Sequence, residues 1–150
     1  MERKLGQHHV RLNFPEMESP TGTVSALKAM TWQALERHVA DLLRRDGCVD
    51  VVVRQAYRDR GIDITARTSD GRCVAVQCKN HVGHRYVSSS AMQRFAGAAR
   101  AVDRVDIALF VATSDFSSEA QAIAELTGVL TVNRLQSEAW SAGTPLKAPR

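Results

Sequence analysis

The spacing of apolar and polar positions divides the middle of the chain into helical and extended segments. Apolar residues recur every three or four positions over residues 31–46, which predicts an amphipathic helix that ends at Gly47. Residues 48–55 are rich in valine and predict a strand. Two further runs, residues 62–67 and 72–79, flank a Ser-Asp-Gly turn and predict a β-hairpin.

The second half of the chain begins with a polar loop and continues with one helix and one strand. Ser89 or Ser90 is expected to cap a helix that reaches about residue 102. Residues 107–112 form the continuous apolar run that is typical of a buried strand. The expected apolar face of the helix comprises Met92, Phe95, Ala96 and Ala99.

A last helix and strand are predicted after a loop over residues 113–117. Ser118 and Gln121 predict a capping box for a helix that ends at Gly128. Residues 129–132 predict a short strand, and the chain from Leu135 onward is expected to be a Gly-, Pro- and Lys-containing tail.

The order of these elements is helix, three strands, helix, strand, helix and strand. It predicts an α/β domain with a central mixed β-sheet flanked by helices, and 150 residues are enough for one such domain. Residues 1–28 are expected to form an N-terminal extension or linker. The folded domain is expected over residues 29–138, and a C-terminal tail over residues 139–150.

The turn of the hairpin decides which side chains share a face of the sheet. A two-residue turn would mix polar and apolar side chains on one surface, whereas a three-residue loop at 69–71 separates them. The three-residue loop also places Gly71 where such loops favour a left-handed residue. In this register one apolar face carries Ile62, Ile64, Ala66, Val74, Val76 and Cys78.

The opposite face of the hairpin gathers polar groups at one end. Asp63 lies directly across from Gln77, and Lys79 follows two residues further along the same side. Lys79 is the single lysine between residues 29 and 146, in a chain that otherwise uses arginine there. An ordinary cross-strand ion pair between Asp63 and Lys79 would explain this arrangement without any chemistry.

Glu36 adds a fourth polar group from the first predicted helix. It lies at the edge of the apolar stripe that should face the sheet, where a lone buried carboxylate is costly. It therefore needs a partner or a cation, unless it lies in solvent and pairs with Arg37 or Arg44. The apolar stripe consists of Trp32, Leu35, Val39, Leu42 and Leu43.

The net charge of +4 is unevenly distributed along the chain. Residues 54–104 hold ten basic and four acidic side chains, a local excess of +6, so the remainder sums to −2. A basic field of this kind indicates a polyanionic partner, most commonly nucleic acid, although an arginine-rich solvated surface would have the same composition.

The remaining composition limits the cellular context. No segment approaches the apolar length of a membrane span, and Met1 leads into no apolar signal segment, so no membrane partner is expected. The three cysteines, Cys48, Cys73 and Cys78, form no Cys-x-x-Cys pair, which argues against a disulfide scaffold and favours a reducing cytoplasm.

Several short motifs in order resemble one family. Gly61-Ile62-Asp63 followed by Val76-Gln77-Cys78-Lys79 resembles the signature of Mrr-type restriction endonuclease domains of the PD-(D/E)xK nuclease superfamily, with Gln before the lysine instead of an acid. The resemblance includes Leu35-Glu36 and the segments 110–116 and 128–135, and covers roughly residues 29–138. It implies a restriction-endonuclease-like core in the order α-β-β-β-α-β-α-β.

The chain departs from the family pattern at two places. Arg58-Asp59-Arg60-Gly61 stands where the family often has an acidic Gly-Asp-Gly run, and the last strand ends in Asn133-Arg134 instead of Ile-Asp-Gly. Neither change removes a core catalytic position, but both leave the substrate preference open.

The resemblance implies a magnesium-dependent DNA endonuclease that hydrolyses phosphodiester bonds, with Mn²⁺ expected to substitute. It implies metal ligation by Asp63, the side-chain oxygen of Gln77 and the backbone carbonyl of Cys78, with Glu36 in or beside this set. Lys79 would position the attacking water or stabilise negative charge. Candidate DNA contacts are Arg60, Arg85, Arg94 and Arg100.

Alternative interpretations stay open at this point. The role could be type IV-like restriction, DNA processing, or repair and junction cleavage, and the domain could instead be a catalytically silent module that binds nucleic acid or a partner nuclease. A double-strand cutter is expected to be a homodimer, and a separate recognition subunit would supply target choice. A zinc site at Cys78, His81 and His84, with Cys73 nearby, has no standard spacing.

Overall fold

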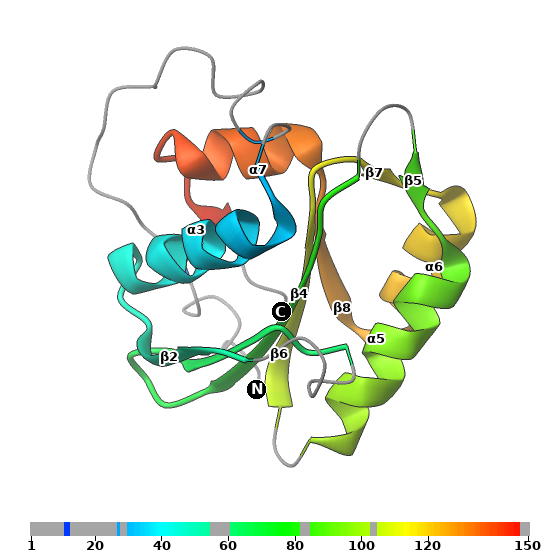
Figure 1. Ribbon diagram of the computed structural model, residues 1–150. Coiled ribbons are helices and arrows are strands. Elements are labelled where there is room, and N and C mark those ends of the chain that lie inside the picture. Colours follow the sequence, from blue (N-terminus) through cyan, green and yellow to red (C-terminus); the bar gives the residue numbers. More distant parts are fainter. Residues whose placement is uncertain are drawn as a thin grey trace.

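A five-stranded mixed β-sheet forms the centre of the computed structural model (Figure 1). The structure describes residues 11–12, 27, 30–54, 61–81, 85–102 and 105–147. The strand order is β2–β3–β4–β6–β8, with the first three strands antiparallel and the last three parallel. The strands are β2 (Val49–Val53), β3 (Ile64–Arg67), β4 (Cys73–Lys79), β6 (Val105–Ala112) and β8 (Val129–Val132).

Helices cover both faces of this sheet, as Figure 1 shows. In the described part of the chain, α3 (Trp32–Arg45) and α7 (Arg134–Ser141) pack on one face. The helices α5 (Ser89–Ala101) and α6 (Ser118–Thr127) pack on the other. The predicted α/β class, with a mixed sheet between helices, is confirmed.

Local sequence signals explain where the helices begin and end. The side chain of Thr31 accepts a hydrogen bond from the backbone of Ala34 at the start of α3. The caps of α5 and α6 are Ser88 and Ser117, whereas the sequence predicted Ser89 or Ser90 for α5 and Ser118 for α6. The capping box predicted from Ser118 and Gln121 is absent, because the cap is Ser117 and the third residue after it is Ala120. The Gln121 side chain accepts a hydrogen bond from Thr131 of β8.

Two apolar layers hold the helices on the sheet. The predicted apolar face of α5 is buried, and its Phe95 packs edge-on against Phe110 of β6 with ring centroids 5.5 Å apart. On the opposite face, Leu35 and Val39 of α3 pack against Val76 and its neighbours. Because β4 and β6 are covered on both sides, successive residues of these strands enter opposite layers.

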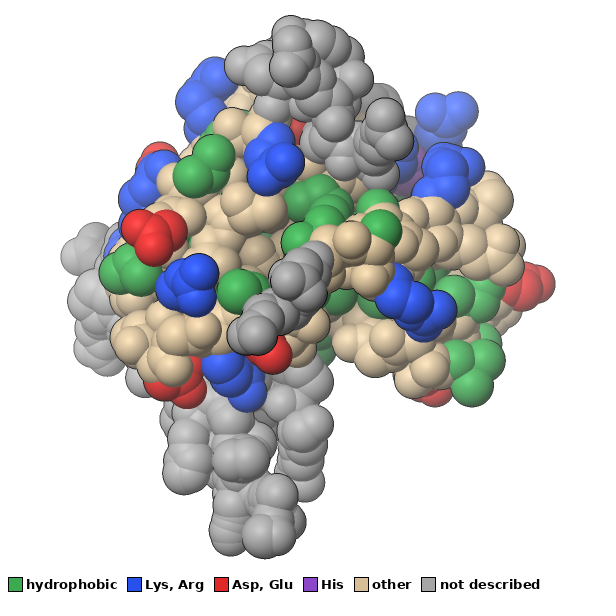
Figure 2. All heavy atoms as spheres, turned by 90° about the horizontal axis from the view of Figure 1, so that it is seen from below, with side chains coloured by type: hydrophobic (Ala, Val, Ile, Leu, Met, Phe, Trp, Pro, Cys, Tyr) green, Lys and Arg blue, Asp and Glu red, His purple; other side chains and the backbone are tan. Residues whose placement is uncertain are grey.

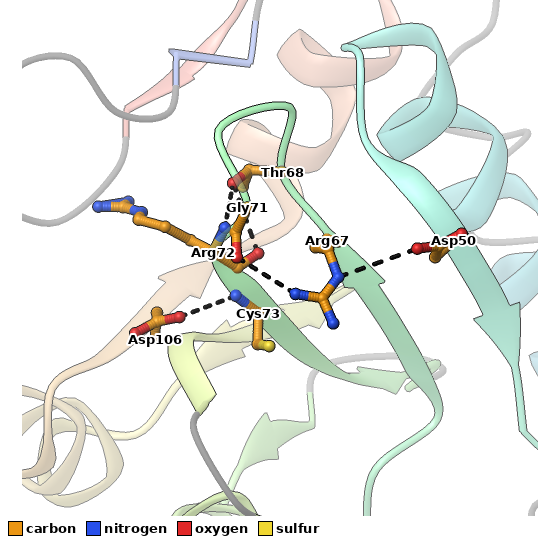
Figure 3. Close-up of polar contacts among 7 residues, drawn as sticks. All are labelled: Asp50, Arg67, Thr68, Gly71, Arg72, Cys73 and Asp106. Atoms are coloured by element: carbon orange, nitrogen blue, oxygen red, sulfur yellow. Dashed lines mark hydrogen bonds and ion pairs between the residues drawn. The ribbon is translucent and has the colours of Figure 1, made fainter.

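The hairpin register predicted from its turn is confirmed over β3. Ile64 pairs with Val76 and Ala66 with Val74, and Gly71 adopts a left-handed conformation at φ 93°. Figure 3 shows the contacts that fix the turn: the backbone of Arg72 accepts from the Thr68 amide at 2.8 Å and donates to the Thr68 hydroxyl at 2.9 Å. The three-residue loop is therefore closed by both backbone and side chain.

Two apolar residues differ from their predicted places. Ile62 packs on the α5 face with Ala75 and Phe110, not beside Ile64, so the predicted apolar face of the hairpin is wrong at this position. Trp32 was predicted on the buried stripe of α3, but 47% of it is exposed. It occupies the first position of the helix, whereas the buried residues of α3 begin one turn later at Leu35.

Short strand pairs flank the main sheet. β5 (Tyr86–Val87), within the predicted polar loop, pairs in parallel with β7 (Asp115–Phe116). β1 (Arg11–Leu12) pairs antiparallel with β9 (Leu146–Lys147). Each has only two residues, too few for a hydrophobic period to be recognised.

The segment predicted as a tail from Leu135 contains the helix α7. Asn133 and Gln136 form a capping box at its start, and Trp140 is 1% exposed in the core beneath α3. The indole Nε1 of Trp140 donates to Asp46 Oδ2 at 2.9 Å, which ties α7 to the end of α3.

The division of the chain into an extension, a domain and a tail stays a prediction. None of the described helices is long and apolar enough to cross a membrane.

The contact between α3 and α7 predicts a pH-dependent stability. Burial raises the pKa of Asp46 from 3.8 to about 7, with the Trp140 hydrogen bond and Arg45 opposing the shift. Since the folded state holds this proton up to about pH 7 and the unfolded state loses it near pH 4, the free energy of unfolding falls as pH rises between them. Asp46→Asn keeps an acceptor for the indole and has no proton to lose.

We therefore expect Asp46→Asn to gain stability relative to the natural chain as pH rises from 4 to 8. The gain is roughly 1 kcal/mol, because water screens this half-buried group. Urea unfolding at several pH values measures it, with Asp115→Asn as an exposed control. A constant difference between the two curves across this range would contradict the assignment.

Candidate active site

The candidate site lies where β3 separates from β4. The amide of Cys78 donates to Asp63 Oδ2 at 2.8 Å, and the amide of Asp63 donates to the carbonyl of Val76 at 2.8 Å. The Asp63 side chain thus supplies the acceptor that a regular antiparallel ladder would take from the backbone. The regular pairing ends at Ile64, and the chain before it turns Ile62 toward α5.

Gln77 completes a convergence of three oxygen-bearing groups. Its Nε2 donates to Asp63 Oδ2 at 2.9 Å and to the carbonyl of Cys78 at 3.2 Å. The amide nitrogen therefore stands between a carboxylate oxygen and a carbonyl oxygen, a place that favours positive charge. Rotation of the amide about its last bond would bring Oε1 to this point and turn three oxygens toward it.

Gly61 allows the chain to pass between Gln77 and α5. Its φ is +104°, a region that side chains rarely adopt. A Cβ atom at this position would lie 3.6 Å from Gln77 Oε1 and from Ala98 Cβ, and 4.0 Å from the carbonyl of Arg94. The glycine of the sequence motif thus positions the site directly against the middle of α5.

Glu36 approaches the same place from α3, on the other face of the sheet. It is 5% exposed, so the alternative of a solvent position beside Arg37 or Arg44 is wrong, and Arg44 pairs with Asp41 at 2.9 Å. The pKa of the Cys78 thiol is raised well above its usual value, chiefly by burial and further by the negative charges of Asp63 and Glu36. The two carboxylates are therefore electrostatic neighbours of one buried residue.

Lys79 is the last residue of β4, and a second basic side chain, Arg85, follows it in the next described segment. By strand alternation Lys79 lies on the side of Gln77, and it is half-buried. The pKa of His81 is lowered chiefly by burial and further by the positive charges of Lys79 and Arg85. The ring Nδ1 of His81 lies 3.3 Å from the hydroxyl of Ser114.

Asn80 links this end of β4 to the neighbouring elements. Its side-chain amide donates to the backbone carbonyl of Met30, just before α3, and its Oδ1 accepts from the Thr113 hydroxyl at 3.1 Å. Asn80 was not among the predicted site residues, and Thr113 and Ser114 entered only as part of the segment 110–116 that carries the family resemblance. No local pattern predicts their contacts, because the linked residues are 33 to 50 positions apart.

The predicted DNA-contact arginines lie at different distances from the site. Arg85, Arg94 and Arg100 are exposed, and the backbone of Arg94 lies beside Gly61. Arg100 is six residues further along α5, about 9 Å along the helix axis. Arg60 lies outside the described residues. In Figure 2 the Lys and Arg side chains are spread around the visible face, with apolar and acidic side chains between them.

The donor set fits a small hard cation better than zinc. The described residues hold no group of three or more His, Cys, Asp or Glu that could share a metal, so an ion here would depend on the oxygens of Gln77 and of the Cys78 backbone. The predicted zinc alternative is unsupported in the described residues: the Cys78 thiol lies in the α3 core layer, and Cys73 lies at the opposite end of β4. His84 lies outside the described residues.

The strand-ending role of Asp63 predicts a stability difference between two substitutions. Asp63→Asn keeps an oxygen acceptor for the Cys78 amide, whereas Asp63→Ala leaves this buried donor without it, at a cost of about 1–3 kcal/mol. Urea unfolding in the presence of a chelator measures both, with Asp115→Ala as an exposed control. Equal losses in the two Asp63 variants would show that the hydrogen bond does not stabilise the fold.

The chain matches one protein family and resembles several solved structures in fold. The family model Mrr_cat, described as a restriction endonuclease, matches residues 27–137. Among solved structures, AF1548, a protein of unknown function, aligns with a TM-score of 0.55 and 20% identity over 71% of this chain and 58% of that chain. This chain thus corresponds to little more than half of that protein's length. No curated protein gave a significant match.

Two named endonucleases show weaker structural similarity. The MspJI restriction endonuclease, solved with a 27-mer oligonucleotide, gives a TM-score of 0.49 at 17% identity, over 81% of this chain and 27% of that chain. A repair endonuclease from Pyrococcus abyssi gives 0.45 at 16% identity, over 69% and 48% of the two chains. The family match covers most of the chain and includes Glu36, Asp63, Gln77 and Lys79. This chain therefore belongs to the Mrr_cat restriction endonuclease family.

Proposed function

We propose that this protein is a metal-dependent DNA endonuclease that hydrolyses phosphodiester bonds. The observation that carries the proposal is the convergence of the Asp63 carboxylate, the Gln77 amide and the Cys78 carbonyl at the end of β4 that Lys79 completes. Membership of a restriction endonuclease family supports the reaction class.

Asp63, Gln77 Oε1 and the carbonyl of Cys78 are the proposed ligands of Mg²⁺, with Glu36 within or next to the set. These are hard oxygen donors, which suit an ion that keeps some of its waters and takes further ligands from phosphate. Bound there, the ion would polarise a phosphoryl oxygen and lower the pKa of the attacking water. Mn²⁺ offers the same coordination chemistry and is the proposed substitute.

The protein groups supply position and charge. The Cys78 amide fixes the Asp63 carboxylate before substrate arrives, so little reorganisation is needed at the moment of reaction. Lys79 holds the attacking water or stabilises the charge that develops on the phosphate. Arg94, beside Gly61, and Arg85, in the neighbourhood of Lys79, contact the flanking phosphates.

We propose restriction or DNA processing as the cellular role, with repair or junction cleavage as the alternative use of the same chemistry. Cutting both strands needs two active sites or one site used twice, so a homodimer is the proposed state of a double-strand cutter. A separate subunit would recognise the target. The catalytically silent DNA-binding module is the competing function, and the cleavage experiment separates it from an enzyme.

Plasmid cleavage with Mg²⁺ tests the proposal directly. The natural chain should nick or linearise the plasmid, while chelation, Lys79→Ala and Asp63→Asn should each lower the rate by at least about 100-fold, as expected for loss of electrostatic stabilisation at the reacting phosphate. Arg44→Ala is the matched control, because it removes an exposed positive charge two helical turns beyond Glu36. Its rate should remain within about twofold of the natural rate.

The outcomes of this experiment separate the two functions. Cleavage that is unaffected by chelation or by Lys79→Ala would overturn the proposed mechanism. An intact plasmid together with metal-independent DNA binding would instead support the silent module.

Gln77→Glu provides a second test that does not depend on activity. A carboxylate at this position would face Asp63 at the present 2.9 Å contact, which is repulsive without a cation and favourable with one. We expect the variant to melt at a lower temperature than the natural chain in a chelator, and to bind Mg²⁺ about tenfold more tightly, or about 1.4 kcal/mol. Thermal melting against Mg²⁺ concentration and calorimetry measure both effects. Tight binding by the natural chain, with no gain in the variant, would exclude Gln77 from the site.

A further inference from the structure

Of the described aromatic side chains, three are buried in the core, Phe116 is partly buried against it, and two are exposed. Phe95, Phe110 and Trp140 are each at most 1% exposed. Trp32 and Tyr86 are 47% and 60% exposed, and they are the two aromatic members of the exposed large apolar set. Single exposed aromatic residues are common on protein surfaces, so only the location of these two can indicate a binding role.

Both residues belong to elements that lie next to the carboxyl end of β4. Trp32 begins α3, and the residue two before it, Met30, accepts a hydrogen bond from Asn80, which directly follows Lys79. Trp32 also lies one helical turn before Glu36, in the same row of side chains. The position of Trp32 is therefore linked to the candidate active site through the Met30–Asn80 hydrogen bond and through Glu36.

Tyr86 approaches from the other side through β5. It follows Arg85, whose charge acts on His81 together with that of Lys79. The strand is held in place by its pairing with β7 and by the hydrogen bond from the Ser117 amide to the Val87 carbonyl at 3.0 Å. In Figure 1 the start of α3 and β5 lie on either side of the upper end of β4.

The elements next to the carboxyl end of β4 therefore combine two exposed rings with a set of basic groups. Basic groups hold the phosphate backbone of a nucleic acid without regard to sequence. Aromatic rings bind any base by stacking, because every base has a flat π-face. In an uninterrupted duplex the faces of the bases are covered by their neighbours, so a protein ring can stack only on a base that is unpaired or displaced.

We propose that Trp32, aided by Tyr86, stacks on an unpaired base beside the phosphate that is cut. The preferred substrate is then DNA with single-stranded or distorted positions next to the cleavage site, not uninterrupted duplex. This inference rests on the proposed function for the position of the cut. The stacking itself is measured without cleavage.

The test compares binding of a single-stranded oligonucleotide and of a matched perfect duplex in the presence of EDTA. Trp32→Leu keeps an apolar side chain but has no aromatic face, and Trp32→Phe restores a ring. Leu126→Ala, on the exposed side of α6, is the control. Melting temperatures confirm that each variant is folded. Tryptophan fluorescence reports contact at Trp32, because the described Trp140 is buried.

We expect Trp32→Leu to weaken single-strand binding about 5- to 150-fold, which corresponds to one lost stack. The loss on the perfect duplex should be at least fivefold smaller, and Trp32→Phe should recover most of the single-strand affinity. The single strand should quench the fluorescence of the natural chain, and this change should vanish in Trp32→Phe. Leu126→Ala should remain within twofold on both DNAs.

Equal losses on both DNAs, or no loss in Trp32→Leu, would overturn the inference. If the natural chain cleaves plasmid but binds the two DNAs without a Trp32-dependent preference, the nuclease proposal stands and this one fails. If Trp32-dependent preference appears but no DNA is cut under any metal condition, stacking is supported and the nuclease proposal fails.

Discussion

The hydrogen bond from the Cys78 amide to the Asp63 carboxylate determines the shape of the functional end of this fold. It ends the regular pairing of β3 with β4, turns Ile62 to the α5 layer and leaves Gln77 alongside the same carboxylate. Chain geometry and site chemistry therefore depend on one side chain. A polar group that stabilises the backbone is also held rigidly, which is what a reacting centre requires.

Local sequence patterns predicted the elements that have a clear period or a defined turn. The hairpin register followed from Gly71 and from keeping one face apolar, and the structure confirms it as far as Ile64. The failure at Ile62 has a local cause, since a side chain replaced the backbone as hydrogen-bond acceptor. The helix α7 was missed because Trp140 is buried by contacts with α3, nearly a hundred residues earlier, although Asn133 and Gln136 carry a capping signal.

Two physical rules made part of the candidate site predictable from the sequence. These are the alternation of side chains along a strand and the high cost of burying a lone charge. Asp63, Gln77 and Lys79 were placed together by the hairpin, and the burial of Glu36 followed from its position on the apolar stripe. The polar contacts that join Asn80 to Met30 and Thr113 follow no periodic pattern. Such long-range contacts form only when the strands have assembled, so the spacing of residues along the chain does not predict them.

The Gln77 amide has a consequence for the stability of the fold when no cation is bound. A pair of acids at this position would repel each other whenever no cation is bound, and the fold would then depend on the supply of ions. Here the amide donates hydrogen bonds to the Asp63 carboxylate and to the Cys78 carbonyl, so these acceptors are satisfied by the chain itself. The hydrogen bonds that hold this end of the sheet together therefore need no bound ion.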